Sequence, residues 1–125
     1  MKATELRIGN YLNGKQGHVI ITEIRTNNSV KILDNTSSFY VGTCLQPIPL
    51  TEEWLLKFGF KQISERVYIK NYHYGYEFGI TNIFIIKNDN YFMRYKHIQH
   101  VHELQNLYFA LTGEELILWH EQILP

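Results

Sequence analysis

The large apolar residues between positions 101 and 112 recur every three or four positions, whereas between positions 66 and 96 apolar and polar residues largely alternate. The first pattern is typical of an amphipathic helix, and the second is typical of half-buried strands. The helical stripe consists of Val101, Leu104, Leu107, Tyr108 and Leu111. Together the two periods predict an α+β protein, in which a helix near 102–112 packs on antiparallel strands.

Residues 5–48 carry the signals of several short strands separated by turns. The run HVIITEI is rich in β-branched residues and ends at the polar cluster TNNS, while VKIL and FYVG are two further strand candidates. Leu6 and Ile8 also alternate with polar neighbours, which favours a strand there. Several strands in so short a segment predict a small SH3-like β-barrel unit over residues 1–48.

The prolines at 47 and 49 interrupt the strand pattern, and LTEEWLLKFGF follows. Thr51 is a good N-cap, the glutamates at 52 and 53 suit the positive end of a helix, and Gly59 is placed to end it. A short helix is therefore expected at 51–58. Adjacent residues on a helix point about 100° apart, so the two glutamates are capping charges rather than a catalytic pair.

Four segments between 66 and 96 return to a period of two and predict an antiparallel β-meander: RVYIKNY, YGYEFGI, NIFIIK and YFMRYK. With the two helices, this meander defines a second α+β subdomain over residues 49–125. The run ELILW at 115–119 is compatible with a last strand or with a second short helix, and Ile117 and Trp119 favour the strand. Burial of the stripe on the 102–112 helix implies that Leu107→Ala costs about 2–5 kcal/mol.

The formal net charge is zero, so the chain has no global field that attracts nucleic acid or anionic membranes. Charge is nevertheless uneven, because most residues from Lys57 to Lys96 that carry charge are basic, and from His97 onward all are glutamates. The single Cys44 excludes an intramolecular disulfide and a cysteine-based zinc site. No apolar run resembles a signal peptide or a membrane span, which predicts a soluble, cytoplasmic protein without a membrane partner.

Three histidines crowd together at positions 97, 100 and 102, and neutral imidazole is a common metal ligand. A metal-dependent enzyme that uses His97, His100 and His102 is therefore one alternative. Helical zinc motifs, however, place two histidines four residues apart, commonly with a glutamate between them, and that spacing is absent here. We expect no metal and no cofactor, and we expect His102 to form a hydrogen bond or a cap at the helix entrance.

No sequence motif of nucleophilic catalysis is present. Cys44 lies in a loop-like segment without a neighbouring histidine, and the glycines at 9, 14 and 17 lack the spacing of a phosphate-binding loop. The sequence therefore predicts a protein that is not an enzyme and has no catalytic residues, although residues distant in the sequence could still converge in space.

One predicted strand carries cations and tyrosines on the same face. Alternation groups Arg66, Tyr68, Lys70 and Tyr72, and a neighbouring strand contributes Arg94 and Lys96. Tyrosine can stack on a base while a cation offsets a phosphate, so these six residues form a predicted site for a nucleotide or nucleic acid. An ordinary solvated sheet face explains the same pattern, because cross-strand pairs of tyrosine and lysine stabilise sheets without a ligand.

The blocks ELRIGNYL, PIPLTEEWLLKFGF and HVHELQNLYFALTGEEL are spread over most of the chain. In these blocks the chain resembles a group of small uncharacterised proteins of Bacteroides-type bacteria, their prophages and their phages. The resemblance implies a phage or mobile-element context, in which small non-catalytic proteins often bind host factors, nucleic acids or signalling nucleotides. It implies no activity, so no catalytic residue follows from it.

These observations favour a non-enzymatic binding protein that acts through a protein partner or through self-association. Tyrosine-rich surfaces suit such interfaces, and exposed sheet edges can pair between subunits. A nucleotide or nucleic-acid ligand is the alternative.

Overall fold

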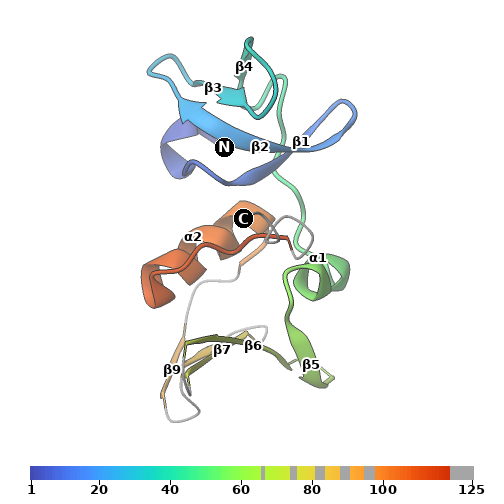
Figure 1. Cartoon of the computed structure of the whole chain (residues 1–125), viewed down its shortest axis with the longest axis vertical. Helices are drawn as coiled ribbons and strands as arrows, with labels where there is room; N and C mark the ends of the chain where they lie inside the picture. Colours follow the sequence, from blue (N-terminus) through green and yellow to red (C-terminus); the bar gives the residue numbers. More distant parts are fainter. Residues whose placement is uncertain (66, 74–75, 81–83, 88–90, 95–97, 119–125) are drawn as a thin grey trace. The chain divides into compact units, whose positions relative to one another are not determined.

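The computed structural model describes the chain except residues 66, 74–75, 81–83, 88–90, 95–97 and 119–125, and it gives only the backbone of residues 64, 72–73, 76–80, 84–87 and 91–94. The chain forms two compact units. The first comprises Met1–Pro49 and His100–Leu107, and the second comprises Leu50–Gln99 and Tyr108–Pro125. Each unit contains its own antiparallel sheet, as Figure 1 shows.

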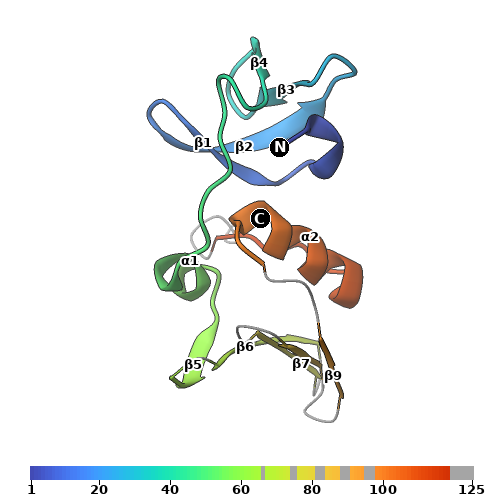
Figure 2. The same ribbon diagram turned by 180° about the vertical axis from the view of Figure 1, so that it is seen from behind.

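The sheet of the first unit has four antiparallel strands in the order β1-β2-β3-β4. They are β1 (Tyr11–Gly14), β2 (Gly17–Ile24), β3 (Ser29–Ile32) and β4 (Ser38–Tyr40). The register shifts between Ile21 and Glu23, and such a bulge increases the local bend and twist of a strand. The resulting curled sheet, seen from two sides in Figures 1 and 2, is a half-barrel. It confirms the small N-terminal β-unit.

The expected strand at Leu6 and Ile8 is wrong. A short 3-10 helix, η1 (Ala3–Glu5), comes first, and the chain then turns before β1 begins. The turn is closed by a backbone hydrogen bond from Asn10 to Arg7 and requires a φ of +97° at Gly9. Glycine adopts that conformation without steric cost, so the alternation of Leu6 and Ile8 is overridden by a turn.

The core of the first unit lies on the concave side of the half-barrel. Its buried members are Ala3, Leu6, Leu12, Ile21, Val30, Val41 and Leu45. Strands β1, β2 and β3 supply one residue each, Leu12, Ile21 and Val30, and the others come from η1 and from the connecting segments. Full burial of a branched aliphatic side chain contributes about 1.5–3 kcal/mol, so the leucine, isoleucine and valine members supply most of the apolar stabilisation of this core.

In the second unit, helix α1 (Glu52–Lys57) confirms the predicted short helix and both of its ends. The Thr51 hydroxyl accepts a hydrogen bond from the backbone N–H of Trp54 at 3.4 Å, and Gly59 has the positive φ of a C-terminal stop, +92°. Leu55 and Phe58 are buried. Lys57 lies 3.0 Å from Glu53 in an exposed pair, and such pairs contribute about 0.3–0.5 kcal/mol.

The five-stranded sheet of the second unit confirms the β-meander, because its strands are hydrogen-bonded in sequence order. The strands are β5 (Lys61–Ser64), β6 (Val67–His73), β7 (Tyr76–Ile80), β8 (Phe84–Lys87) and β9 (Tyr91–Arg94). Strand β5 was not anticipated, since KQIS has only one β-branched residue and no clear alternation.

Helix α2 (Val101–Thr112) confirms the predicted helix, and Gly113 follows it with a φ of +77°. Val101, Leu104 and Tyr108 are buried, whereas Leu107 and Leu111 are only half-buried.

The segment 115–118 is neither strand nor helix, which overturns the strand preferred for ELILW. Leu116 and Leu118 are buried, so this segment adds alternate apolar side chains to the core, and Trp119 lies outside the described residues. No helix among the described residues is long and apolar enough to cross a membrane.

Candidate functional site

The predicted ligand face is described at two of its six residues. Tyr68 and Lys70 lie two positions apart on β6, so they share one face of the sheet, and both are half-buried. Arg66 and Lys96 lie outside the described residues, and only the backbone of Tyr72 and Arg94 is described. The site as a whole therefore stays a prediction, and its described part is the pair of Tyr68 and Lys70.

The strand registers do not group backbone position 94 with this pair. Directly paired residues of antiparallel strands lie on the same face, and the ladder connects Tyr68 with Ile80, Ile80 with Ile85, and Ile85 with Met93. Arg94 follows Met93, so its position alternates to the opposite face. The sequence could not reveal this, because strand alternation gives the faces within each strand but not the register between strands.

Tyr68 has an acidic neighbour within the second unit. Its hydroxyl donates a hydrogen bond to the carboxylate of Glu52, the first residue of α1. Burial, and then the charge and hydrogen bond of Glu52, raise the pKa of Tyr68 above its usual value of 10.0. The tyrosine hydroxyl therefore connects β6 with α1 and stays protonated at neutral pH.

Lys70 is placed beside Gly59, just after the end of α1. Its Nζ lies 2.9 Å from where a Cβ on Gly59 would be, so the amine occupies the space that this glycine leaves open. Burial lowers the pKa of Lys70, and the charge of Glu114 opposes that shift. A cation near the carboxyl end of a helix is favourable, since the last carbonyls carry partial negative charge.

Tyr68 and Lys70 thus each face a carboxylate, Glu52 and Glu114 respectively. A phosphate that approached this pair would meet two negative charges as well as one positive charge. Since like charges repel and an existing partner must be displaced, the described surroundings favour a fold-stabilising role for the pair over phosphate binding.

The histidine cluster is described at two of its three members, because His97 lies outside the described residues. The rings of His100 and His102 stack, with centroids 5.7 Å apart and planes 14° from parallel. The nitrogen lone pairs of such rings lie in parallel planes, whereas tetrahedral ligation needs them to converge on one point. No group of three potential metal ligands forms among the residues that the structure describes.

His100 rather than His102 occupies the entrance of α2. The Glu103 carboxylate accepts hydrogen bonds from the backbone N–H of His100 at 2.9 Å and from its ring Nδ1 at 2.8 Å. The hydrogen bond expected of His102 is not formed by its Nδ1 within the described part of the chain. His102 is 4% exposed, and its buried Nδ1 has no hydrogen-bond partner in the described part of the chain.

Three amide side chains that the sequence did not single out attach α2 to the half-barrel. The Oε1 of Gln105 accepts the backbone N–H of Tyr11 at 2.9 Å, and its Nε2 donates to the carbonyl of Gly9 at 3.1 Å. The Nδ2 of Asn10 donates to Asn106 at 2.9 Å. Buried amides with partners from both elements fix the helix on β1, so this cluster is structural.

The convex side of the half-barrel presents a different surface. We call it the outer face and define it by the outward positions of β2, β3 and β4 and their flanking residues: Glu23, Arg25, Lys31, Leu33, Ser38 and Tyr40. Direct pairing of Glu23 with Lys31 and of Lys31 with Ser38 places these residues on one face. Leu33 continues the alternation of β3, and its backbone N–H donates to the carbonyl of Ile20 at 2.9 Å.

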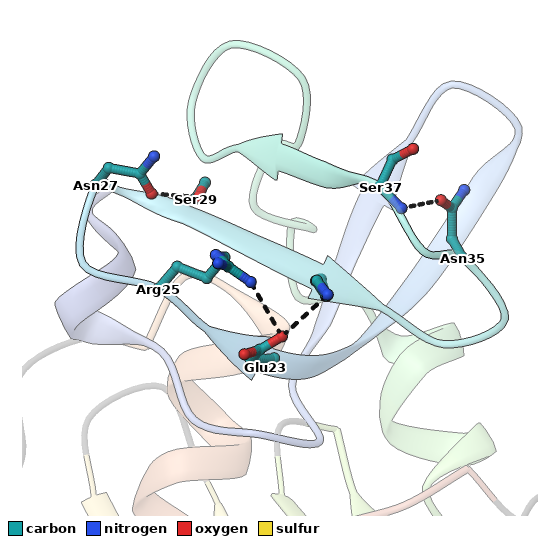
Figure 3. Close-up of polar contacts among 7 residues, drawn as sticks. Glu23, Arg25, Asn27, Ser29, Asn35 and Ser37 are labelled. Carbon is teal, nitrogen blue, oxygen red and sulfur yellow. Dashed lines mark hydrogen bonds and ion pairs between the residues drawn. The ribbon is translucent and has the colours of Figure 1, made fainter.

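At the centre of the outer face the Glu23 carboxylate lies between two cations, as the dashed lines in Figure 3 show. The Arg25 guanidinium is 3.4 Å away and the Lys31 amine is 3.6 Å away. The turns on either side are fixed by local hydrogen bonds, from Ser29 to Asn27 and from the Ser37 backbone to Asn35. This arrangement holds three charged side chains in place and leaves a net charge of one positive unit.

Two large side chains on the outer face are mainly in water. Leu33 is 53% exposed and Tyr40, which pairs with Ser29 across β3 and β4, is 55% exposed. Single exposed apolar residues are common, but tyrosine and arginine are enriched where proteins meet. The outer face combines an aromatic, an aliphatic and a charged group on one rigid sheet, which makes it the best-defined candidate for an interaction surface.

Comparisons with protein-family models, with curated proteins and with solved structures found no match to this chain.

Proposed function

We propose that the chain is a non-enzymatic binding protein of phage or mobile-element type, and that it acts through a protein partner or a second copy of itself. The observation that supports the proposal is the exposure of Leu33 and Tyr40 on the outer face, beside the Glu23 ion pairs. Removal of apolar surface from water contributes about 25 cal/mol per Å², so a partner that covers both residues gains free energy from them.

The charges of the outer face add selectivity to this apolar contribution. Glu23, Arg25 and Lys31 are 35–49% exposed at the side chain, so a partner can approach them without prior unfolding. Exposed ion pairs contribute at most about 1 kcal/mol to stability, and their exchange for contacts with a partner therefore costs little. Complementary charges on the partner would set its orientation and its rate of association.

A photo-crosslinking residue placed at Leu33 or at Tyr40 tests the proposal. Gln16, which is exposed in the β1–β2 turn, provides the matched control position. Adducts formed by the purified protein with itself report self-association, and adducts formed only in a host lysate report a partner. The expected result is adducts from 33 and 40 and none from 16; equal yields at all three positions in both settings would contradict the proposal.

A nucleotide or nucleic acid at Tyr68 and Lys70 is the second candidate, and its support is that both residues lie on one face of β6. A thermal-shift screen with nucleotides, cyclic dinucleotides and short oligonucleotides tests it, because a ligand that prefers the native state raises the melting temperature. Lys70→Ala should weaken such binding mainly at low salt, whereas Tyr68→Ala should weaken it at every salt concentration.

A further inference from the structure

His102 is a titratable group in a place that suits neither of its protonation states. It lies in the first turn of α2 and is 4% exposed. The neutral ring leaves the buried Nδ1 without a hydrogen-bond partner among the described residues. The protonated ring would place a buried positive charge near the positive end of the helix macrodipole, which is unfavourable.

We propose that His102 makes the start of α2 an acid-sensitive latch, closed while the imidazole is neutral and opened when the imidazole is protonated. This device goes beyond the proposed binding function and does not depend on it. It concerns the first unit alone, because His100–Leu107 and the half-barrel belong to the same compact unit.

Four charged or titratable groups act on the His102 ring. Glu103 lies on α2 and His100 directly precedes it, while Glu5 and the amino group of Met1 come from the N-terminal segment. Burial lowers the pKa of His102 below 6.5, Glu103 and Glu5 oppose this effect, and His100 and the amino group reinforce it. Glu103 is already engaged by the backbone and ring of His100, so it is a shared rather than a dedicated partner.

Opening of the latch breaks a small and identifiable set of contacts. The backbone N–H of Val101 donates to Ile48 at 2.9 Å, and the N–H of Leu104 donates to His100 at 3.2 Å. The contacts of Gln105 with Tyr11 and Gly9 lie one turn farther along α2 and can remain in place. The amides of Val101 and Leu104 therefore report opening, and the amide of Ile21, bonded to Asn10 at 3.0 Å, reports on the sheet.

The difference in proton affinity of His102 between the open and closed states sets how strongly opening depends on pH. In the open state the ring is in water and has its ordinary pKa, so the open state binds the proton more tightly than the closed state. Between that ordinary pKa and the lower pKa of the closed state, the opening constant rises about tenfold for each unit by which the pH falls.

Native-state hydrogen exchange on the whole chain, from about pH 7.5 to about pH 5.5, tests the latch across the range in which histidine titrates. The protection factors of Val101 and Leu104, corrected for intrinsic exchange, should fall about tenfold per pH unit below about pH 6.5, while that of Ile21 stays constant. His102→Gln should abolish the fall. His18→Gln, at an exposed histidine of the same unit, should retain it.

Constant protection of Val101 and Leu104 throughout this range would overturn the proposal, and so would an unchanged fall in His102→Gln. Imidazole NMR of the unsubstituted protein gives a test that does not depend on folding of the variant. The latch requires the His102 ring to titrate together with the loss of α2 protection. A ring that becomes protonated while Val101 and Leu104 stay protected would contradict it.

Discussion

The Oε1 of Gln105 accepts the backbone N–H of Tyr11 at 2.9 Å, which joins positions 94 residues apart in the sequence. The same side chain donates through Nε2 to the carbonyl of Gly9 at 3.1 Å. One amide thus satisfies both a donor and an acceptor at the start of β1, much as a neighbouring strand would. These two hydrogen bonds of Gln105 therefore hold α2 on the half-barrel in addition to the burial of apolar side chains.

Gln105→Ala should lower the free energy of unfolding by about 2–3 kcal/mol, because backbone groups of Tyr11 and Gly9 lose their partners in a buried setting. Denaturation with urea at neutral pH provides the measurement. Gln46→Ala is the matched control in the same unit, since Gln46 is exposed and its amide donates to the nearby carbonyl of Gly42. Equal losses in the two variants would show that the Gln105 contacts do not fix α2.

Leu104→Ala should cost about 2–5 kcal/mol, whereas Leu107→Ala should cost clearly less. Leu104 is fully buried and Leu107 is only half-buried, so truncation at 107 leaves a smaller cavity and removes less transfer free energy. The sequence alone predicted a cost of about 2–5 kcal/mol for Leu107→Ala, and the half-burial of Leu107 lowers that expected cost. Chemical denaturation of both variants decides it, and a larger loss for Leu107→Ala would place the core on a different side of α2.

Periodicity predicted α1, α2 and most strands because those elements bury the faces that their sequences make apolar. It failed at Leu6 and Ile8, where a local turn competed with a weak alternation, and at residues 115–118, which bury two leucines in a segment that is neither strand nor helix. At Leu6 and Ile8 the turn that Asn10 and Arg7 close, with its positive φ at Gly9, decides the conformation, and alternation alone does not reveal such a turn.

The surroundings of the candidate site residues were harder to predict than the fold. Sequence alternation grouped Tyr68 with Lys70 correctly on one strand, but it could not supply the carboxylates of Glu52 and Glu114, which come from distant segments. The outer face was missed, since its residues come from three strands and only the register brings Glu23 beside Lys31. One usable signal was present, because the charged residues Glu23, Arg25 and Lys31 mark a face that avoids the core.

The hydroxyl of Tyr68 should ionise at a higher pH than that of a solvated tyrosine, and Glu52→Gln should lower its pKa towards 10.0. The folded-state pKa lies above the unfolded value, so this stabilisation is present below pH 10.0 and is lost as the pH rises through the folded pKa. NMR of labelled tyrosine rings measures the titration. Glu53→Gln is the control, because Glu53 pairs with Lys57 instead, and an equal shift in both variants would contradict the Glu52 contact.

His102→Leu should leave the protein at least as stable at neutral pH, because an apolar side chain of similar size replaces a buried Nδ1 that has no hydrogen-bond partner among the residues that the structure describes. The pH dependence should change as well. The folded-state pKa of His102 is lowered, so the stability linked to the neutral ring is present above pH 6.5 and is lost as the pH falls from there to the folded pKa. Urea denaturation at several pH values between about 7.5 and 5 should therefore show a steeper acid loss in the unsubstituted protein than in His102→Leu. Because His100, Glu103 and Glu5 are present in both proteins, the difference between the two curves isolates the His102 ring. Parallel curves would mean that this ring takes up its proton equally well in the folded and unfolded chains.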